Sequence, residues 1–436
     1  MKINVNEILY AVSSGLDAVE AELLGHISTG HSKRLAVLSI ITAKGLGLSS
    51  KDLIDIAAFS ILHDNALTEV NQEEHQYRKY NGGKGYSETD YSIRRCIIGE
   101  NNAKLIPFRT NCRDVIMLHR ENADGSGPFG RSASNTPVKA QIIHLAELID
   151  HNFNLNDISK PNYLGIIDYV KNNTDTLFSA EVSKAFVKSF KHKHLNALSF
   201  GSIDTTIRKA TKSFNDEYSI TEILNLATLF AKIIDYKSFY SCVHSLGVAQ
   251  KAIHMADYYK YPTEKGVRFY LAGALHDVGK LMIKNEILQK PSRLTDAEYE
   301  QMRSHAFYTH EILGKLKGFD DIVLWASHHH EKLNGSGYPF GLDASQLSSE
   351  ERLMTCCDIY QALTEARPYK DGFTHAKAME IMRDMVIKGE IDMDIVNDMN
   401  YEMTLNRKVD RSSPTSILYS SEDVYVKTDE NNHVIN

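Results

Sequence analysis

A histidine-rich loop occurs twice in the chain, once complete and once altered. The complete copy is HHHEKLNGSGYPFG (328–341), and the altered copy is LHRENADGSGPFG (118–130). The altered copy keeps one histidine, the glutamate and the glycines. It has Arg120 where the complete copy has His330, and it lacks a counterpart of Tyr338. Such a repeat indicates that a larger structural unit has been duplicated.

Further segments match in the same order and at nearly the same spacing. HSKRLA (31–36) matches HSLGVA (244–249), and LHDN (62–65) matches LHDV (275–278), both at an offset of 213 residues. Ordered matches at a nearly constant offset predict two tandem domains related by internal duplication. We place the boundary near residue 200, which gives domains of residues 1–200 and 201–436.

The hydrophobic pattern predicts helices in both halves. Residues 220–234 and 376–386 carry apolar side chains at helical spacing, and strict alternation is scarce before the C-terminal tail. The 9 prolines of the chain fall mainly in loop-like segments. The expected fold class is therefore all-α.

Composition limits the partners of the protein. The net charge is −7 and no run of lysine or arginine is present, so a polymeric nucleic acid is not expected as a partner. The chain has no run of 18 apolar residues and no signal-peptide pattern, so we expect no membrane span. Five cysteines without a framework spacing fit a reducing cytoplasm.

The second half contains a series of side chains that bind divalent metals in proteins. They are His244, His276, Asp277, His305, His329, His330 and Asp358. On a helix, Lys280 would share a face with His276 and Asp277. Burying these three side chains together is costly unless they bind a charged species.

At this point the residues match a family. The segments HSLGVA, HDVGK, HHEKLNGSGYP and DIYQALTEARPYK resemble the HD-GYP phosphodiesterases, a branch of the HD metal-dependent phosphohydrolases. The resemblance covers roughly residues 220–400. It implies two HD-type helical domains, of which the second is catalytic, and hydrolysis of cyclic dinucleotides. The family acts chiefly on c-di-GMP, and some tandem members act on 3′,3′-cGAMP, so we expect either substrate, with a slight preference for 3′,3′-cGAMP.

The resemblance also implies a metal centre. The seven side chains named above would be its ligands, and Asp277 would bridge two divalent ions, iron or manganese. Some relatives bind a third ion through a glutamate four residues before the first histidine, where this chain has Tyr240. A dinuclear centre is therefore expected.

Other roles follow from the same match. Asp277 and Lys280 would be catalytic, and Lys280, Arg367 and Lys370 would bind phosphate. Tyr338 would contact the substrate from its glycine-rich loop, or else serve only the turn. Successive helical positions point about 100° apart, so we expect His328 to face away from the site. Gln361 stands where the family usually has aspartate, and we expect it behind the ligands.

The first half has lost part of this set. It keeps His31, His63, Asp64 and His119, whereas the positions of His305, His330, Asp358 and Lys280 are taken by Arg95, Arg120, Glu147 and Leu67. Guanidinium groups do not bind metals. We predict that the two arginines pair with Asp64 or Glu147, and that the metal centre lies only in the second half. A single ion on His31, His63, Asp64 and Glu147 is the alternative.

The first half is therefore expected to be non-catalytic and to stabilise the second half, form a homodimer or sense a ligand. Two other functions of the chain stay open. One is a receptor that binds a cyclic dinucleotide without hydrolysis, and the other is an HD hydrolase of a different nucleotide phosphate ester. The complete ligand set and Lys280 favour hydrolysis over binding alone.

Overall fold

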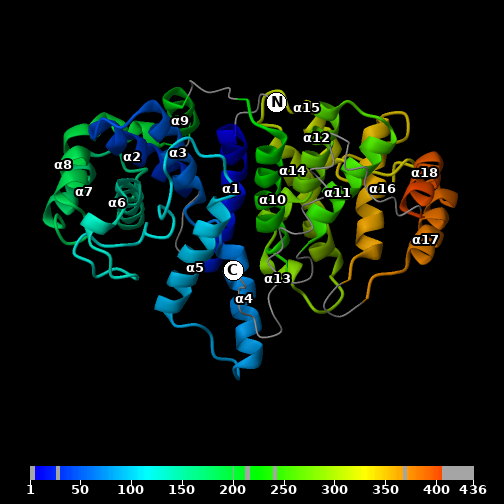
Figure 1. Cartoon of the computed structure of the whole chain (residues 1–436), viewed down its shortest axis with the longest axis horizontal. Coiled ribbons are helices and arrows are strands. Elements are labelled where there is room, and N and C mark those ends of the chain that lie inside the picture. The colour runs from blue at the N-terminus through cyan, green and yellow to red at the C-terminus, as the bar shows by residue number, and fades with distance from the viewer. Residues whose placement is uncertain are drawn as a thin grey trace.

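The computed structural model describes residues 5–25, 30–199, 201–211, 217–238, 243–366 and 371–404. These residues form helices joined by loops, and no strand occurs among them. The all-α expectation is confirmed. Figure 1 shows the helices of the two halves on opposite sides of a central region that contains α1 and α10.

The helices of the first half precede residue 211. They are α1 (Val5–Leu24), α2 (His31–Gly45), α3 (Ser50–Leu62), α4 (Leu67–Tyr80), α5 (Glu88–Ala103), α6 (Val138–Asn152), α7 (Lys160–Asn172), α8 (Ala180–Ser189) and α9 (Ile203–Ala210), with the short 3-10 helices η1 (Ala133–Asn135), η2 (His192–His194) and η3 (Asn196–Leu198).

The second half has a similar order of elements. They are α10 (Ile220–Asp235), α11 (His244–Tyr258), α12 (Thr263–Leu275), the 3-10 helix η4 (Val278–Met282), α13 (Asn285–Leu288), α14 (Asp296–Leu313), α15 (Asp320–Ser327), α16 (Ser349–Thr364), α17 (His375–Ile387) and α18 (Met393–Thr404). The helices expected over 220–234 and 376–386 are thus present as α10 and α17.

Capping side chains decide where several of these helices begin. Before α10, the Ser219 hydroxyl accepts a hydrogen bond from the Glu222 N–H, and the Glu222 carboxylate accepts one from the Ser219 N–H. The same reciprocal pair precedes α14 and α16. Each pair satisfies N–H groups that a helix leaves without partners at its first turn.

The two halves repeat a local arrangement around their first histidines. Helix α2 packs on α3, and α11 packs on α12. The Asp17 carboxylate accepts a hydrogen bond from the Ser32 N–H, and the Asp235 carboxylate accepts one from the Ser245 N–H. These matched contacts support the proposed duplication.

Helix α9 packs on the first half although it follows residue 200. It contacts α2 and α3, and Arg208 and Asp204 form ion pairs with Glu7 and Lys33. We therefore propose that the first domain extends through α9, a few residues beyond the boundary placed from the sequence.

Helix α1 joins the halves. It belongs to the first half but contacts η4 and α14 of the second. Gly15 lies so close to Leu281 that an added Cβ would stand 2.9 Å from the leucine Cβ. Nearby, the Glu22 carboxylate accepts a hydrogen bond from the Asn285 N–H and forms an ion pair with Lys237. One hydrophobic cluster of buried residues runs through both halves.

Within the described residues, no helix combines the length and the apolar character that crossing a membrane requires.

The contact between α1 and η4 can be tested by overpacking. We expect Gly15→Leu to lower the free energy of unfolding by about 1–3 kcal/mol, because the new side chain must displace Leu281. Urea unfolding measures this change. Gly201→Ala is the control, since nothing lies within 4 Å of the Cβ that it adds. Equal unfolding midpoints for Gly15→Leu and the parent would contradict the close packing of α1 on η4.

Candidate metal centre

The pair His276-Asp277 lies at a break between two helices. Helix α12 ends at Leu275, and the 3-10 helix η4 begins at Val278. The expected single α-helical face for His276, Asp277 and Lys280 is therefore wrong in its geometry. Lys280 nevertheless lies close to Asp277, as expected. The tighter 3-10 turn lets the Lys280 ammonium form an ion pair with the Asp277 carboxylate.

The two carboxylate oxygens of Asp277 face different pairs of histidines. Oδ2 lies 3.2 Å from His276 Nε2 and 3.9 Å from His244 Nε2. Oδ1 lies 3.3 Å from His305 Nε2 and 3.9 Å from His329 Nε2. A carboxylate placed in this way has one oxygen for each of two neighbouring cations.

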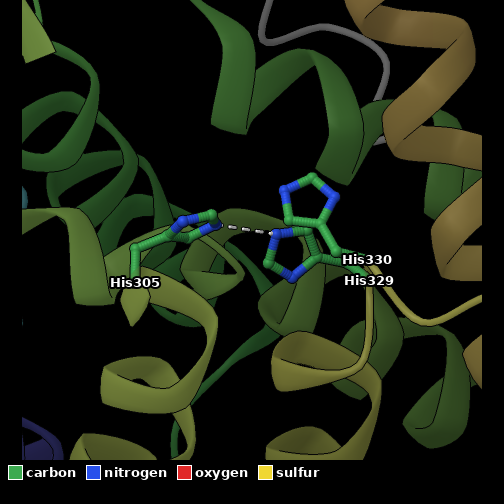
Figure 2. A group of neighbouring side chains, drawn as sticks. All are labelled: His305, His329 and His330. Carbon is green, nitrogen blue, oxygen red and sulfur yellow. Dashed lines mark hydrogen bonds between the residues drawn. The ribbon is translucent and has the colours of Figure 1, made fainter. Parts of the chain in front are cut away.

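Asp358 and His330 lie at the same centre. Asp358 Oδ1 is 3.0 Å from His244 Nε2, and Asp358 Oδ2 is 3.7 Å from His330 Nδ1. Figure 2 shows His305 turned toward His329 and His330, with 3.3 Å between the Nε2 atoms of His305 and His329. The structure thus brings together all seven side chains that the sequence selected as metal ligands.

Contacts behind the histidines aim their Nε2 atoms at the centre. In four of the rings Nδ1 is hydrogen-bonded to a backbone carbonyl or a carboxylate: His276 to Gly273, His305 to Met302, His329 to Ala326 and His244 to Glu365. Such contacts fix the tautomer and orientation of metal-binding histidines.

The environment keeps several of these rings neutral. Burial lowers the pKa of His305 to about 4 and that of His330 to about 3. Burial also opposes charge on His244, but its hydrogen bonds to Asp358 and Glu365 outweigh burial and raise its pKa to about 10, so an ion that binds His244 must displace a proton. Neutral imidazole is the form that binds metals.

The buried atoms of the centre fit a divalent cation. His276 Nε2 and Asp277 Oδ1 are buried and have no hydrogen-bond partner among the described residues. Unpaired buried polar atoms cost free energy. Imidazole nitrogen and carboxylate oxygen together suit first-row divalent ions such as iron and manganese.

Glu365 is a residue that the sequence analysis missed. Its carboxylate lies 3.0 Å from His244 Nδ1. Gln361, expected behind the ligands, is within 3.5 Å of the same carboxylate and accepts a hydrogen bond from Lys251. Gln361 stands where the family usually has aspartate, and Glu365 follows it by four residues. This spacing is the only signal for Glu365 in the sequence.

His328 and Tyr338 lie as expected from the sequence. His328 Nδ1 contacts the Glu351 carboxylate, outside the cluster of candidate ligands. The ring centroid of Tyr338 is 4.7 Å from that of His330. The Glu331 carboxylate accepts hydrogen bonds from the N–H groups of residues 340–342. These bonds hold the loop that carries Tyr338.

Arg303 is a second residue that the sequence did not single out. Its guanidinium carbon stands 4.7 Å from the centroid of the Tyr338 ring, and Nη1 pairs with Glu300 at 2.7 Å. Arg367 and Lys370, which were predicted to bind phosphate, lie outside the described residues, as does Tyr240, which stands where some relatives have a metal-binding glutamate.

In the first half, the arginine replacements occupy the corresponding centre. Arg95 pairs with Asp64, and Arg120 Nη2 lies 2.7 Å from Glu147 and 3.3 Å from Asp64. The predicted pairing of both arginines with these carboxylates is confirmed. Two guanidinium charges there balance two buried carboxylates.

The contact of Glu365 with His244 predicts an effect on metal affinity. We expect Glu365→Gln to weaken metal binding about 10- to 100-fold, because His244 loses the carboxylate that orients its ring. Competition with a chromogenic chelator measures the affinity. Glu402→Gln is the matched control, since Glu402 contacts His254 at 3.0 Å away from the centre. If both variants bind metal equally well, Glu365 does not position His244.

Comparisons with known proteins agree with this geometry. The family model described as HD domain matches residues 228–395. A 3′3′-cGAMP-specific phosphodiesterase 1 of Vibrio cholerae is 27% identical over 410 residues, which cover 90% of each chain. A 3′3′-cGAMP-specific phosphodiesterase 3 of the same organism is 39% identical over 36% of this chain and 35% of its own.

Two further matches are also to proteins named as phosphodiesterases. A cyclic di-GMP phosphodiesterase of Pseudomonas aeruginosa is 38% identical over 33% of this chain and 35% of its own. The crystal structure of a cyclic GMP-AMP specific phosphodiesterase of V. cholerae (V-cGAP3) aligns with 93% of this chain and 99% of its own, with a TM-score of 0.62 and 21% identity. Residues 228–395 therefore match an HD domain, and the whole chain is similar in fold to this phosphodiesterase structure.

Proposed function

We propose that the second half is a metal-dependent phosphodiesterase that opens a cyclic dinucleotide to a linear dinucleotide. The observation that carries this proposal is the position of Asp277, whose two oxygens face separate pairs of histidines. This arrangement is the one needed to hold two divalent ions side by side. In such a site, a pair of divalent ions activates water and neutralises phosphate charge.

The residues around the ions would bind and orient the substrate. Lys280 is held beside Asp277, so its ammonium group supplies a fixed positive charge for a phosphate oxygen. Tyr338 offers a ring face and a hydroxyl next to His330, and Arg303 stacks on that ring. We assign these two side chains to a base or phosphate next to the reacting one.

The substrates we propose are 3′,3′-cGAMP and c-di-GMP. The first is favoured slightly, because the relative that aligns with 90% of this chain is named for 3′3′-cGAMP. We propose two ions, iron or manganese, in the second half, and a cytoplasmic location. The first half would be non-catalytic, since Arg95 and Arg120 fill its centre, and it would stabilise the second half or contribute to a homodimer.

A substrate panel tests the function directly. Metal-loaded protein is incubated separately with 3′,3′-cGAMP, c-di-GMP and nucleoside triphosphates, and the products are separated by chromatography. A linear dinucleotide from either cyclic substrate is expected. Tight binding of a cyclic dinucleotide without turnover would indicate a receptor. Release of triphosphate from a nucleoside triphosphate, with both cyclic substrates intact, would overturn the proposal.

The role of Lys280 predicts a loss of rate without a loss of metal. We expect Lys280→Ala to lower kcat about 100- to 1000-fold, or ~2.7–4 kcal/mol, because one charge contact to the transition state is removed. Steady-state kinetics and metal analysis measure both quantities. The control is Lys284→Ala, whose side chain is 70% exposed. Parental turnover by Lys280→Ala would remove this lysine from the catalytic group.

The bridging position of Asp277 predicts that its loss removes both ions of the second half. Asp277→Ala should abolish hydrolysis together with this metal content, measured by elemental analysis of the folded protein. The matched first-half variant, Asp64→Ala, should leave these two ions in place, because Asp64 pairs with Arg95 and Arg120 instead. Full metal content in Asp277→Ala would contradict the bridging role.

A further inference from the structure

Three buried side chains of the first half meet beside the arginine-filled centre. They are Glu20 of α1, His31 at the start of α2 and His63 directly after α3, and one potential ligand atom of each lies within 4.8 Å of the others. Glu20 Oε1 is 3.4 Å from His31 Nε2 and 3.6 Å from His63 Nε2. All three are at most 4% exposed.

The surrounding charges leave Glu20 without a cationic partner of fixed charge. Asp64 and Glu147 are paired with Arg95 and Arg120. Within the described part of the chain, Glu20 has ion-pair contacts with His31 and His63 and with no lysine or arginine. A buried carboxylate between two imidazoles is costly unless a bound cation or a proton compensates its charge.

Both histidines are oriented as metal-binding histidines are. His31 Nδ1 lies 2.6 Å from the Asp150 carboxylate, and His63 Nδ1 lies 3.0 Å from the Ser60 carbonyl oxygen. The Nε2 atoms of both rings are buried, face Glu20 and have no hydrogen-bond partner among the described residues. An Nδ1 held by an oxygen acceptor, with Nε2 facing a carboxylate at 3.4 or 3.6 Å, is the pattern of metal-binding imidazoles.

The second half shows the same orienting contacts at the corresponding positions. There, His244 Nδ1 contacts the Glu365 carboxylate and His276 Nδ1 contacts the Gly273 carbonyl. The first half has therefore kept the contacts that aim two imidazoles, although it has replaced other members of the centre.

Ions can reach this cluster from a cavity. A cavity of about 430 Å³ is lined by residues that include Glu20, His31, Tyr91, Arg95 and Glu147. The cavity touches two of the three side chains, so the site is buried but has an entry path.

We propose that the first half binds a single divalent ion through Glu20, His31 and His63, with zinc as the ion that best fits two imidazoles and one carboxylate. The site differs from the alternative drawn from the sequence, because Asp64 and Glu147 are occupied by arginines and Glu20 takes their place. The same arginines exclude a second ion. The site therefore does not hydrolyse phosphodiesters in the way proposed for the second half.

The site lies where a bound ion would affect the second half through the packing of α1. Its three members come from α1, from the start of α2 and from the residue after α3, so a bound ion would fix α1 against the rest of the first half. Helix α1 packs on η4, the 3-10 helix that carries Lys280. Ion binding in the first half thus holds the surface on which the Lys280 segment rests.

Metal counting in the full-length chain tests the proposal. The double variant His276→Ala, Asp277→Ala removes the second-half centre, and the protein is treated with chelator and then dialysed against Zn²⁺. We expect about one zinc ion per chain by elemental analysis, and a rise in the melting temperature on adding zinc. Adding Glu20→Gln and His63→Gln should remove both the ion and the rise.

Matched variants separate loss of ligands from loss of fold. Glu22→Gln lies on the same helix, and His144→Gln replaces another buried histidine of the first half that bonds Asn122. Both should retain the ion, and circular dichroism checks the helical content of every variant. Should the double variant not fold, Glu20→Gln in the otherwise unchanged chain must bind one zinc ion fewer than the parent.

Two results would overturn the proposal. One is a folded double variant that binds no zinc. The other is an ion that persists when Glu20 and His63 are both replaced, which would place it elsewhere in the chain. Neither result depends on whether the second half hydrolyses cyclic dinucleotides, because the readouts are metal content and thermal stability.

Discussion

The carboxylate of Asp277 is the group around which the second half is organised. It is 2% exposed, and a buried charge of this kind is costly unless cations compensate it. Lys280 supplies one compensating charge, and the flanking histidines supply nitrogen atoms that would hold the proposed metal ions beside it. The break between α12 and η4 serves this arrangement, because a continuous helix would point the neighbouring side chains in other directions.

The first half meets the same electrostatic requirement by different means. Arg95 and Arg120 place two permanent charges beside Asp64 and Glu147, so the carboxylates stay buried without the metal pair. Replacing histidine by arginine in this way keeps the helical scaffold, since the carboxylates and their helices stay in place. It removes the imidazoles needed for hydrolysis and leaves Glu20, His31 and His63 as a smaller set beside the arginines.

The halves share a core as well as a set of repeated motifs. One cluster of buried apolar residues extends through both, and α1 packs on the segment that carries Lys280. The first half, proposed above to be non-catalytic, can therefore affect the second half through packing alone. Because interiors are close-packed, a shift of α1 is transmitted to η4.

From the sequence alone, helical periodicity predicted the helical class, ordered matches predicted the repeated motifs, and the resemblance to a known family picked out seven candidate ligands among residue types that bind metals. The sequence also predicted the pairing of Arg95 and Arg120. Only the tertiary structure decided which groups stand behind and beside the ligands. Glu365 lies within a matched motif but at a position to which the resemblance gives no role, and Arg303 and Glu20 lie outside the motifs, because a carboxylate or guanidinium that completes a site can come from any element that packs next to it. Spacing along the chain carries no signal for such contacts, since packing alone brings the groups together.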